Sequence, residues 1–308
     1  MPAAAQDQDI ARLQRALDTA DAVLVGAGSG LSTAAGLTYS GERFETLFAD
    51  FIAAYGFTDM YTAGFHPFAS LEERWAYWSR NIWCNRYVAT PKNTYSTLLT
   101  LLEGRDFFIL TTNVDHRFQL AGLPKERLFY TQGDYGLWQC AVPCHPRTYD
   151  NHETVRRMIL AQGFTIAADG ALVAPERGLL MTVPGELVPH CPVCGEPMTM
   201  NLRADDTFVE DTGWHEAASR YRQFLQSHSD DRVLFLELGV GANTPVIIKY
   251  PFWRSTYANP KAVYACVNRG EALAPEQILD RSILIDTDID AVLTALASTT
   301  SQEHRNAE

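Results

Sequence analysis

Four of the six cysteines stand in two close pairs, a spacing typical of a metal site. Cys140 and Cys144 form a C-x-x-x-C pair, and Cys191 and Cys194 form a C-x-x-C pair within VPHCPVCGEPM. Four thiolates spaced in this way match a closed tetrahedral zinc site. The glycine after Cys194 permits a turn that points both sulfurs of its pair at one ion. We therefore predict one structural zinc ion, which replaces a hydrophobic core in a small lobe.

Other interpretations of these cysteines exist. Reduced thiols without a metal are one, and a redox C-x-x-C is another. A redox pair usually opens a helix, whereas proline and glycine punctuate this stretch. His145 and His190 lie beside the cysteines and are alternative ligands. Because a closed four-cysteine site has no open coordination position, the sequence assigns the zinc to structure and not to catalysis.

A glycine-rich turn, Gly26, Gly28 and Gly30 in DAVLVGAGSG, is a second feature that could do chemistry. It follows an apolar strand and precedes a helical pattern, a context that suits phosphate binding. The strict dinucleotide fingerprint requires glycine at position 31, which is Leu31, and a second strand after the helix. The next stretch, GLTYSGERFETLF, looks helical instead. An ordinary hydride-transferring dehydrogenase is therefore disfavoured, and a tight turn without a ligand stays open.

The elements that must position these residues alternate between strand and helix. Continuous apolar runs predict strands buried on both faces of a parallel sheet, at 22–25, 106–113, 127–133, 232–241, 262–268 and 282–288. Helical patterns at 7–20, 94–104, 214–228 and 289–297 separate them. The alternation predicts an α/β fold: a Rossmann-like parallel sheet with a smaller helical and zinc-binding lobe inserted.

Two stretches break this alternation. In the aromatic-rich residues 38–92, one helix face carries Leu71, Trp75, Trp78 and Ile82, which indicates a core between helices. Residues 136–214 contain both cysteine pairs, several prolines and strand-like pieces such as 178–190. The predicted domains are a Rossmann-like domain (9–37, 93–135 and 215–300), the helical part of a small domain (38–92), its zinc-binding part (136–214) and a frayed tail (301–308).

Composition excludes several classes of function. Acidic residues outnumber basic ones by 37 to 25, and the formal charge is −12. Nucleic-acid binding through phosphate neutralisation is therefore not expected. No apolar run approaches the ~20 residues that span a bilayer, and the N-terminus lacks the basic start and apolar stretch of a signal peptide. We expect a soluble, cytoplasmic protein without a membrane partner.

The order of the motifs resembles one family. GAGSGLSTAAGL, TTNVDHRF, TQG, the four-cysteine knuckle, LGVGANTPV and VNR follow one another as in sirtuins, over roughly residues 20–290. The resemblance implies an NAD-consuming enzyme with a Rossmann-like NAD-binding domain and a zinc-bearing small domain. It also implies NAD contacts for single residues: Gly26, Ala27, Gly28 and Ser29 around the phosphates; Asn113 and Asp115 at the nicotinamide-side ribose and the nicotinamide; Gly239, Gly241 and Asn243 at phosphate and adenosine ribose; and Asn268 at that same ribose.

The departures from the sirtuin pattern concern the reactive end of NAD and the substrate. Gln132 and Gly133 stand where sirtuin deacylases have His-Gly, whose His is the general base that deprotonates a ribose hydroxyl. An amide is not basic near neutral pH, so Gln132 can orient the ribose but cannot relay that proton. Residues 38–41 replace the family's P-D-F-R segment, and residues 201–214 replace its V-V-x-F-G-E substrate strand.

This combination looks like the class M sirtuins, microbial proteins often associated with macrodomain proteins. The resemblance implies transfer of ADP-ribose from NAD to a lipoylated carrier protein of the glycine cleavage H type, with a macrodomain hydrolase as functional partner. ADP-ribosyl transfer requires that C1′ is exposed to an acceptor, which can supply a carboxylate as the nucleophile. Unlike deacylation, it does not require the later deprotonation of a ribose hydroxyl. Catalytic roles then fall to Asn113 and Gln132. Arg203 is either a residue that steers an anionic acceptor or a solvated arginine.

Three rival functions stay open. The first is deacylation with another base, for which His116 is the obvious substitute. The second is a catalytically silent sensor of NAD or ADP-ribose, against which the presence of Asn113 and Asp115 argues. The third is plain hydrolysis of NAD, which shares the first half of the mechanism.

Overall fold

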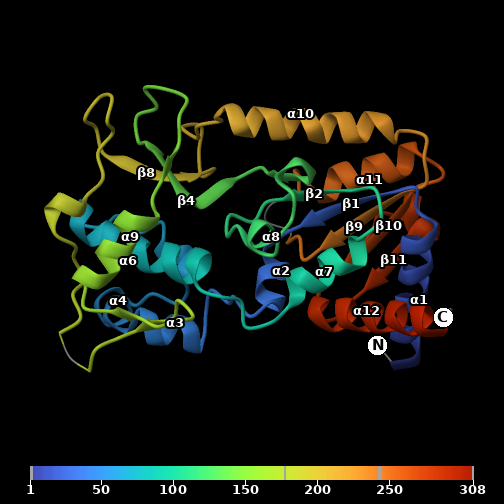
Figure 1. The fold of residues 1–308 in the computed structure, drawn as a ribbon, viewed down its shortest axis with the longest axis horizontal. Helices are drawn as coiled ribbons and strands as arrows, with labels where there is room; N and C mark the ends of the chain where they lie inside the picture. Colours follow the sequence, from blue (N-terminus) through green and yellow to red (C-terminus); the bar gives the residue numbers. More distant parts are fainter. Residues whose placement is uncertain (1–2, 177, 242–244, 307–308) are drawn as a thin grey trace.

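The computed structural model describes residues 3–176, 178–241 and 245–306, which form a larger and a smaller lobe (Figure 1). The larger lobe is built on a six-stranded sheet of order β11-β10-β9-β1-β2-β3. Every neighbouring pair in it is parallel. Its strands are β1 (Ala22–Ala27), β2 (Phe107–Thr111), β3 (Leu128–Tyr130), β9 (Val233–Leu238), β10 (Val263–Val267) and β11 (Ser282–Ile285). The predicted parallel sheet is confirmed.

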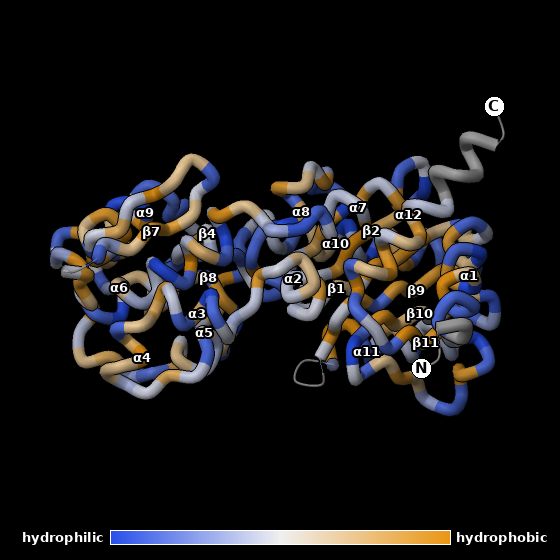
Figure 2. The backbone as a smooth tube through the Cα atoms, turned by 90° about the horizontal axis from the view of Figure 1, so that it is seen from below, coloured by the Kyte–Doolittle hydropathy of each residue, from blue (hydrophilic) through white to orange (hydrophobic). Residues whose placement is uncertain are grey.

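Helices cover both faces of this sheet, because the apolar strands need burial on both sides. One face packs against α1 (Ala3–Thr19), α2 (Ser29–Ala34), α7 (Thr94–Leu102) and α12 (Ile289–Asn306). The other packs against α10 (Thr212–Ser227) and α11 (Lys249–Ala258), with the 3-10 turn η4 (Glu276–Arg281). Alternate residues of β1 serve the two cores: Val23 and Val25 belong to the first, and Leu24 to the second. Figure 2 shows the apolar strands inside these layers.

The smaller lobe is assembled from two separate stretches of the chain. The first contributes α3 (Glu42–Leu47), α4 (Ala49–Tyr55), α5 (Met60–Ala63), α6 (Leu71–Ile82) and a π-helical turn, η1 (Trp83–Tyr87). The second contributes β4 (Gly133–Cys140), β5 (Tyr149–Asp150), α9 (His152–Ala161), the β6 (Thr165–Ile166) and β7 (Leu172–Val173) hairpin, and β8 (Met198–Leu202). An antiparallel sheet of order β5-β4-β8 carries the cysteines at one end.

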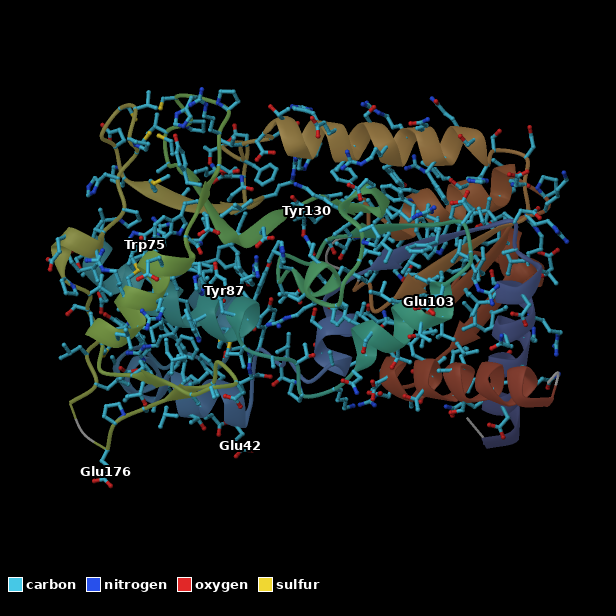
Figure 3. The ribbon with its side chains drawn as sticks, viewed as in Figure 1. Glu42, Trp75, Tyr87, Glu103, Tyr130 and Glu176 are labelled. Carbon is cyan, nitrogen blue, oxygen red and sulfur yellow. The ribbon has the colours of Figure 1, made fainter. Side chains whose placement is uncertain are left out.

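The smaller lobe has an extensive hydrophobic core, which corrects the expectation that zinc replaces one. Trp75 is fully buried on α6 and packs its ring 5.0 Å from that of Trp138 on β4 (Figure 3). The predicted apolar face of α6 is confirmed, since Ile82 is also fully buried and Leu71 and Trp78 pack against the same core. The lobe therefore has substantial apolar burial of its own to hold it together.

Two further expectations about local structure are wrong. Residues 178–190 form no strand; their regular structure is the 3-10 turn η3 (Gly185–Leu187), flanked by Pro184 and Pro189, which cannot donate to a strand ladder. The tail expected to fray from residue 301 instead continues α12 as far as Asn306. Within the described ranges, no helix combines the length and apolar character needed to cross a membrane.

Candidate active site

The predicted site residues gather where the strands of the large sheet end. The carboxyl ends of parallel strands meet at one edge, which is where open α/β sheets bind ligands. The turn after β1 and the loops after β2, β9 and β10 all lie at this edge. Figure 3 places Tyr130, the last residue of β3, between the two lobes. Residues that are far apart in the sequence are thereby brought into one region.

The glycine turn packs against the loop that follows β9. The Gly28 amide donates to the Leu238 carbonyl at 3.0 Å, and the Gly30 amide donates to the Gly239 carbonyl at 3.0 Å. A Cβ on Gly28 would lie 2.5 Å from the Gly239 oxygen, and one on Gly30 would lie 2.7 Å from its Cα. Because these neighbours are backbone atoms that cannot rotate away, the close approach requires glycine. Ser29, between the two glycines, is exposed at the start of α2.

Gly26 and Ala27 end β1 and are buried below this turn. A Cβ on Gly26 would lie 2.3 Å from Ile248 Cγ2 and 2.7 Å from the Phe252 ring. Gly26 therefore allows α11 to pack closely on the end of β1. Its role in the structure is helix packing beneath the turn, whereas Gly28 and Ser29 face the edge of the sheet.

The loops after β9 and β10 form the other side of this edge. Gly239 has a φ of 64°, in the left-handed region that favours glycine. Asn268 follows β10, and its side-chain amide donates to the Val240 carbonyl at 3.1 Å. This hydrogen bond keeps Asn268 beside the segment that contains Gly239 and Gly241. Asn243, also predicted to contact NAD, lies outside the described residues.

Asn113 and Asp115 belong to a buried hydrogen-bond network centred on Ser32. Asn113 Nδ2 donates to the Gly28 carbonyl at 2.9 Å and to Ser32 Oγ at 3.1 Å. Ser32 Oγ donates to Asp115 Oδ2 at 2.5 Å and lies 2.9 Å from the Tyr95 hydroxyl. Burial raises the pKa of Asp115 above its ordinary value, and the bond from Ser32 opposes that rise. The network fixes both predicted residues relative to the glycine turn.

Gln132 lies at the junction between the two lobes. It follows β3 of the large sheet and precedes Gly133, the first residue of β4. Gly133 has a φ of 94°, and a Cβ there would lie 1.8 Å from the Asn201 carbonyl oxygen, so this position requires glycine. The half-buried Gln132 side chain makes no hydrogen bond to any described residue. Its amide is therefore free to bond a ligand.

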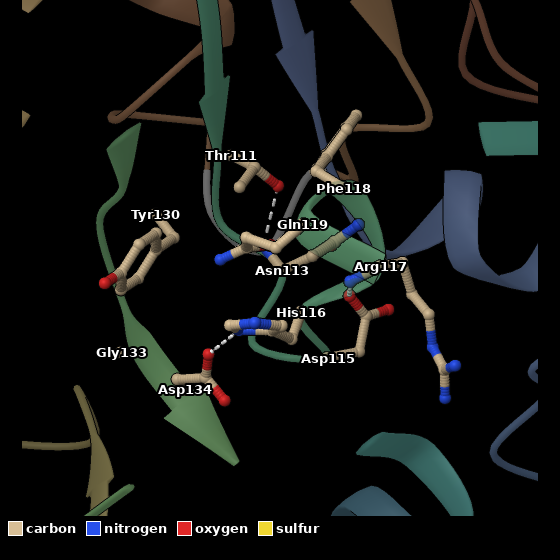
Figure 4. A pocket seen from close by; sticks show the side chains of 10 residues that line it. All are labelled: Thr111, Asn113, Asp115, His116, Arg117, Phe118, Gln119, Tyr130, Gly133 and Asp134. Carbon is tan, nitrogen blue, oxygen red and sulfur yellow. Dashed lines mark hydrogen bonds and ion pairs between the residues drawn. The ribbon is translucent and has the colours of Figure 1, made fainter. Parts of the chain in front are cut away.

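A small pocket beside these residues contains an acid and a base that face one another. Figure 4 shows its lining, which consists of Thr111, Asn113, Asp115, His116, Arg117, Phe118, Gln119, Tyr130, Gly133 and Asp134. His116 Nδ1 is hydrogen-bonded to the Asp134 carboxylate. Arg86 Nε forms an ion pair with the same carboxylate at 3.0 Å. Sequence reasoning singled out His116 as a substitute base but missed Asp134 and Arg86, which reach it only through the fold.

Arg203 is held beside Gln132 by the small lobe. Its backbone amide donates to the Gln132 carbonyl at 3.0 Å. Its guanidinium lies 4.5 Å from the Phe208 ring centroid and 5.4 Å from that of Trp214, and it pairs with Glu210. The side chain is 37% exposed, so it is neither a freely solvated arginine nor a buried one. The structure thus brings Arg203 next to the backbone of Gln132, between β3 and β4.

The four predicted cysteine ligands lie together at the end of the small antiparallel sheet. Their sulfur atoms all lie within 4.8 Å of one another. Cys140 and Cys194 are 3.5 Å apart, and Cys144 and Cys191 are 3.7 Å apart. Tetrahedral zinc with bonds of about 2.3 Å separates its sulfurs by about 3.8 Å, so this set fits zinc. His145 Nδ1 lies 2.9 Å from the Cys144 sulfur and 4.0 Å from the Cys191 sulfur, but the group of mutually close ligand atoms consists of the four cysteines.

Comparisons with known proteins agree with this geometry. No family model matches the chain. Solved sirtuin structures share its fold at low sequence identity. One, of Sir2Tm bound to a propionylated peptide, has a TM-score of 0.57 at 15% identity and covers 95% of this chain and 98% of that one. Another, of Sir2 with a p53 peptide and NAD+, has a TM-score of 0.54 at 16% identity, covering 94% and 98%. The fold is that of the sirtuins.

Relatives of higher sequence identity define the family within that fold. A Staphylococcus aureus (strain Mu50) protein named protein ADP-ribosyltransferase is 38% identical over 296 residues, which cover 96% of this chain and 89% of that protein. A Fusarium oxysporum f. sp. cubense protein named probable bifunctional ADP-ribose hydrolase/ADP-ribosyltransferase is 32% identical over 243 residues, 76% of this chain and 38% of that protein. The chain belongs to the sirtuin-like protein ADP-ribosyltransferases, and the predicted enzyme class, NAD-dependent ADP-ribosyl transfer, is confirmed.

Proposed function

We propose that this enzyme transfers ADP-ribose from NAD to a carboxylate of a lipoylated carrier protein and releases nicotinamide. The turn at Ala27, Gly28 and Ser29 surrounds the NAD phosphates, and the segment at Gly239 and Gly241, with Asn268, contacts the adenosine side. Asn113 orients the nicotinamide-side ribose, and Asp115 holds the nicotinamide. These assignments rest on the positions of the residues along one edge of the sheet and on the sirtuin pattern.

The replacement of the sirtuin base by Gln132 carries this proposal. Gln132 lies where β3 ends, one residue before the Gly133 backbone that lines the pocket. Its amide donates and accepts hydrogen bonds but cannot take a proton from a ribose hydroxyl near neutral pH. A carboxylate acceptor attacks C1′ without needing that proton removed. Transfer therefore remains feasible with an amide at this position, whereas deacylation loses its base.

Arg203 is the residue that we assign to the acceptor. Its guanidinium is stacked on Phe208 and Trp214, which limits the motion of the side chain and fixes the orientation of its N–H donors. The pairing with Glu210 is solvent-exposed, and exposed ion pairs contribute little to stability, about 0–1 kcal/mol. An acceptor carboxylate can therefore take the place of Glu210. The site next to Gln132 thus suits an anionic protein acceptor.

A structural zinc ion and a hydrolytic partner complete the proposal. Zinc bound to the four cysteines would tie the loop after β4 to the knuckle before β8, on which Arg203 depends for its position.

A partner of the macrodomain type would remove the ADP-ribose that this enzyme adds. The Fusarium relative, whose name gives both ADP-ribose hydrolase and ADP-ribosyltransferase, supports a pairing of the two activities.

The experiment follows labelled NAD with and without lipoylated carrier protein. We expect label on the carrier, and much less on the same carrier without lipoyl groups. Gln132→Ala should lower the transfer rate by about 100-fold, the scale of a lost orienting contact. Gln223→Ala, an exposed glutamine on α10, is the matched control. The proposal fails if the wild-type enzyme leaves the carrier unlabelled, or if it releases acyl-ADP-ribose from an acetylated peptide instead.

A further inference from the structure

His116 has a backbone conformation that is uncommon for residues other than glycine. Among the described residues it is the one non-glycine with a positive φ, 63°. This left-handed conformation disfavours residues with a Cβ by roughly 1–2 kcal/mol, and it persists only where surrounding contacts impose it. Such strain concentrates at sites where a side chain must point in a particular direction. The conformation places the imidazole in the pocket beside Asn113 (Figure 4).

The imidazole is oriented by a buried carboxylate. Asp134 is 4% exposed and accepts a hydrogen bond from the Gly136 amide at 2.7 Å, in addition to its ion pair with Arg86. Burial raises the pKa of Asp134, but the bond and charge of His116 and the charge of Arg86 outweigh it and lower that pKa below its ordinary value. Asp134 is thus an anion fixed against His116 Nδ1.

This arrangement decides which imidazole nitrogen is basic. With Nδ1–H donated to Asp134, the neutral imidazole carries its lone pair on Nε2. Among the described residues Nε2 has no hydrogen-bond partner, and the side chain is 27% exposed, so water can reach it. A carboxylate that holds one imidazole nitrogen while the other faces a reacting atom is the arrangement of a general base. No step of the transfer proposed above uses it.

We propose that His116, oriented by Asp134, is a general base that activates water at C1′ of NAD, which makes the enzyme an NAD hydrolase when no acceptor is bound. The water oxygen forms the new bond to C1′ as the bond from C1′ to the nicotinamide nitrogen breaks. The electron pair of the breaking bond leaves with nicotinamide. The water proton passes to Nε2 and then to solvent, and the other product is ADP-ribose. This inference rests on the proposed function only in requiring that NAD is cleaved at C1′.

The charged and titratable groups around the imidazole are Asp134 on β4, Arg86 on η1, Tyr130 on β3, and Asp115 and Arg117 on either side of His116 in the chain. Burial raises the pKa of Tyr130 to about 12, so the phenol stays protonated at working pH. The Tyr130 phenol therefore does not compete with the imidazole as a base.

The test measures nicotinamide release from NAD alone, for wild type, His116→Gln and a matched control. General bases typically contribute 10²–10⁴-fold, so His116→Gln should lower hydrolysis by about 100-fold or more. His228→Gln is the control, because His228 Nδ1 also pairs with an aspartate, Asp231, at 2.8 Å, after α10 and outside this pocket. Calorimetry with NAD shows whether binding survives, and imidazole ¹⁵N NMR shows whether Nδ1 carries the proton.

The ratio of transfer to hydrolysis separates this inference from the proposed function. His116→Gln should raise that ratio at least 10-fold, since an ionised carboxylate needs no base while water does. Unchanged hydrolysis in His116→Gln, or an equal fall in both activities with loss of NAD binding, would overturn the inference. Failure of the wild type to label the carrier, with base-dependent hydrolysis intact, would instead overturn the proposed function alone.

Discussion

Ser32→Ala should destabilise the enzyme in a pH-dependent way, because Ser32 is the hub of the buried network at Asn113. The substitution removes the hydroxyl that donates to Asp115 Oδ2 at 2.5 Å and bonds Tyr95 at 2.9 Å. Asn113 keeps its bond to the Gly28 carbonyl at 2.9 Å, so the largest loss is at Asp115. A hydrogen bond to a charged group contributes about 1.5–3 kcal/mol and a neutral one about 1. We expect a loss of about 2–4 kcal/mol in the free energy of unfolding near pH 8.

The sign of the pH dependence follows from Asp115. Its pKa in the folded enzyme is raised above the ordinary value of 3.8, so its ionisation opposes folding, fully above the folded pKa and not at all below 3.8. Ser32 stabilises the ionised form, so Ser32→Ala raises this pKa further. As the pH falls through the folded pKa, the carboxyl takes up a proton and the difference between variant and wild type shrinks.

Urea unfolding at a series of pH values from 8 downward measures the effect, with Ser79→Ala as the matched control. Ser79 is fully buried, accepts a bond from Gln162 Nε2 at 2.8 Å and donates to the Ala76 carbonyl at 3.0 Å. Because neither partner ionises, Ser79→Ala should lose about 1 kcal/mol throughout the series. A loss for Ser32→Ala that does not change with pH, or is no larger than the control's, would refute the assignment of an ionised Asp115 bonded to Ser32.

Two further predictions concern the metal and the ribose. Removing zinc with a chelator should lower the free energy of unfolding by about 4 kcal/mol, if the ion is present at about 1,000 times its Kd. Hydrogen exchange should become faster near Cys140 and Cys191, while the core around Trp75 stays protected. Absence of zinc in the pure protein, or global unfolding of the lobe, would contradict this. Asn113→Ala should lower the rate constant of NAD cleavage by about 100-fold in single-turnover assays. Its free energy of unfolding should fall by about 1–3 kcal/mol, because the Gly28 carbonyl loses its partner. Cleavage at the wild-type rate would remove Asn113 from the mechanism.

The sheet was predictable because its signal is local. Each strand is an apolar run, and the glycine turn after β1 lies directly next to one of them. The cysteine cluster was predictable for a similar reason, since each pair is close in sequence and zinc demands four ligands. The apolar face of α6 was predictable, but its packing against β4 was not, because a section of the larger lobe that contains α7, β2, α8 (Arg117–Leu120) and β3 lies between these two elements in the chain. Trp75 and Trp138, on these two elements, meet only in the folded chain.

In the candidate site, too, residues with a local sequence signal were predictable, whereas contacts between distant segments were not. Asn113, Asp115 and Gln132 stand out because each lies in the segment just after a strand of the sheet, and strand ends are visible in sequence. Ser32 lies in the glycine motif but carries no sign of a bond to a residue 83 positions later. Asp134 directly follows the Gln132-Gly133 pair, yet its partner Arg86 comes from the small lobe, 48 positions earlier. Nothing local in the sequence indicates such pairs.

Two of the three departures from the sirtuin pattern, at Gln132 and at residues 201–214, are physically connected. Thr131 bonds to Thr111 of β2 through its amide at 3.0 Å, while its carbonyl accepts a bond from Trp214 Nε1 at 3.1 Å. One residue later, the Gln132 carbonyl accepts the Arg203 amide. The backbone at Gln132 is thus held on one side by the large sheet and on the other by the altered segment. In a Gln132→His variant, residues 201–214 would still differ from the sirtuin substrate strand. A base acts only on a substrate that is positioned for it, and this segment would not position an acyl peptide. Gln132→His alone should therefore not restore deacylation, because the change of reaction depends on the segment as well as on the single side chain.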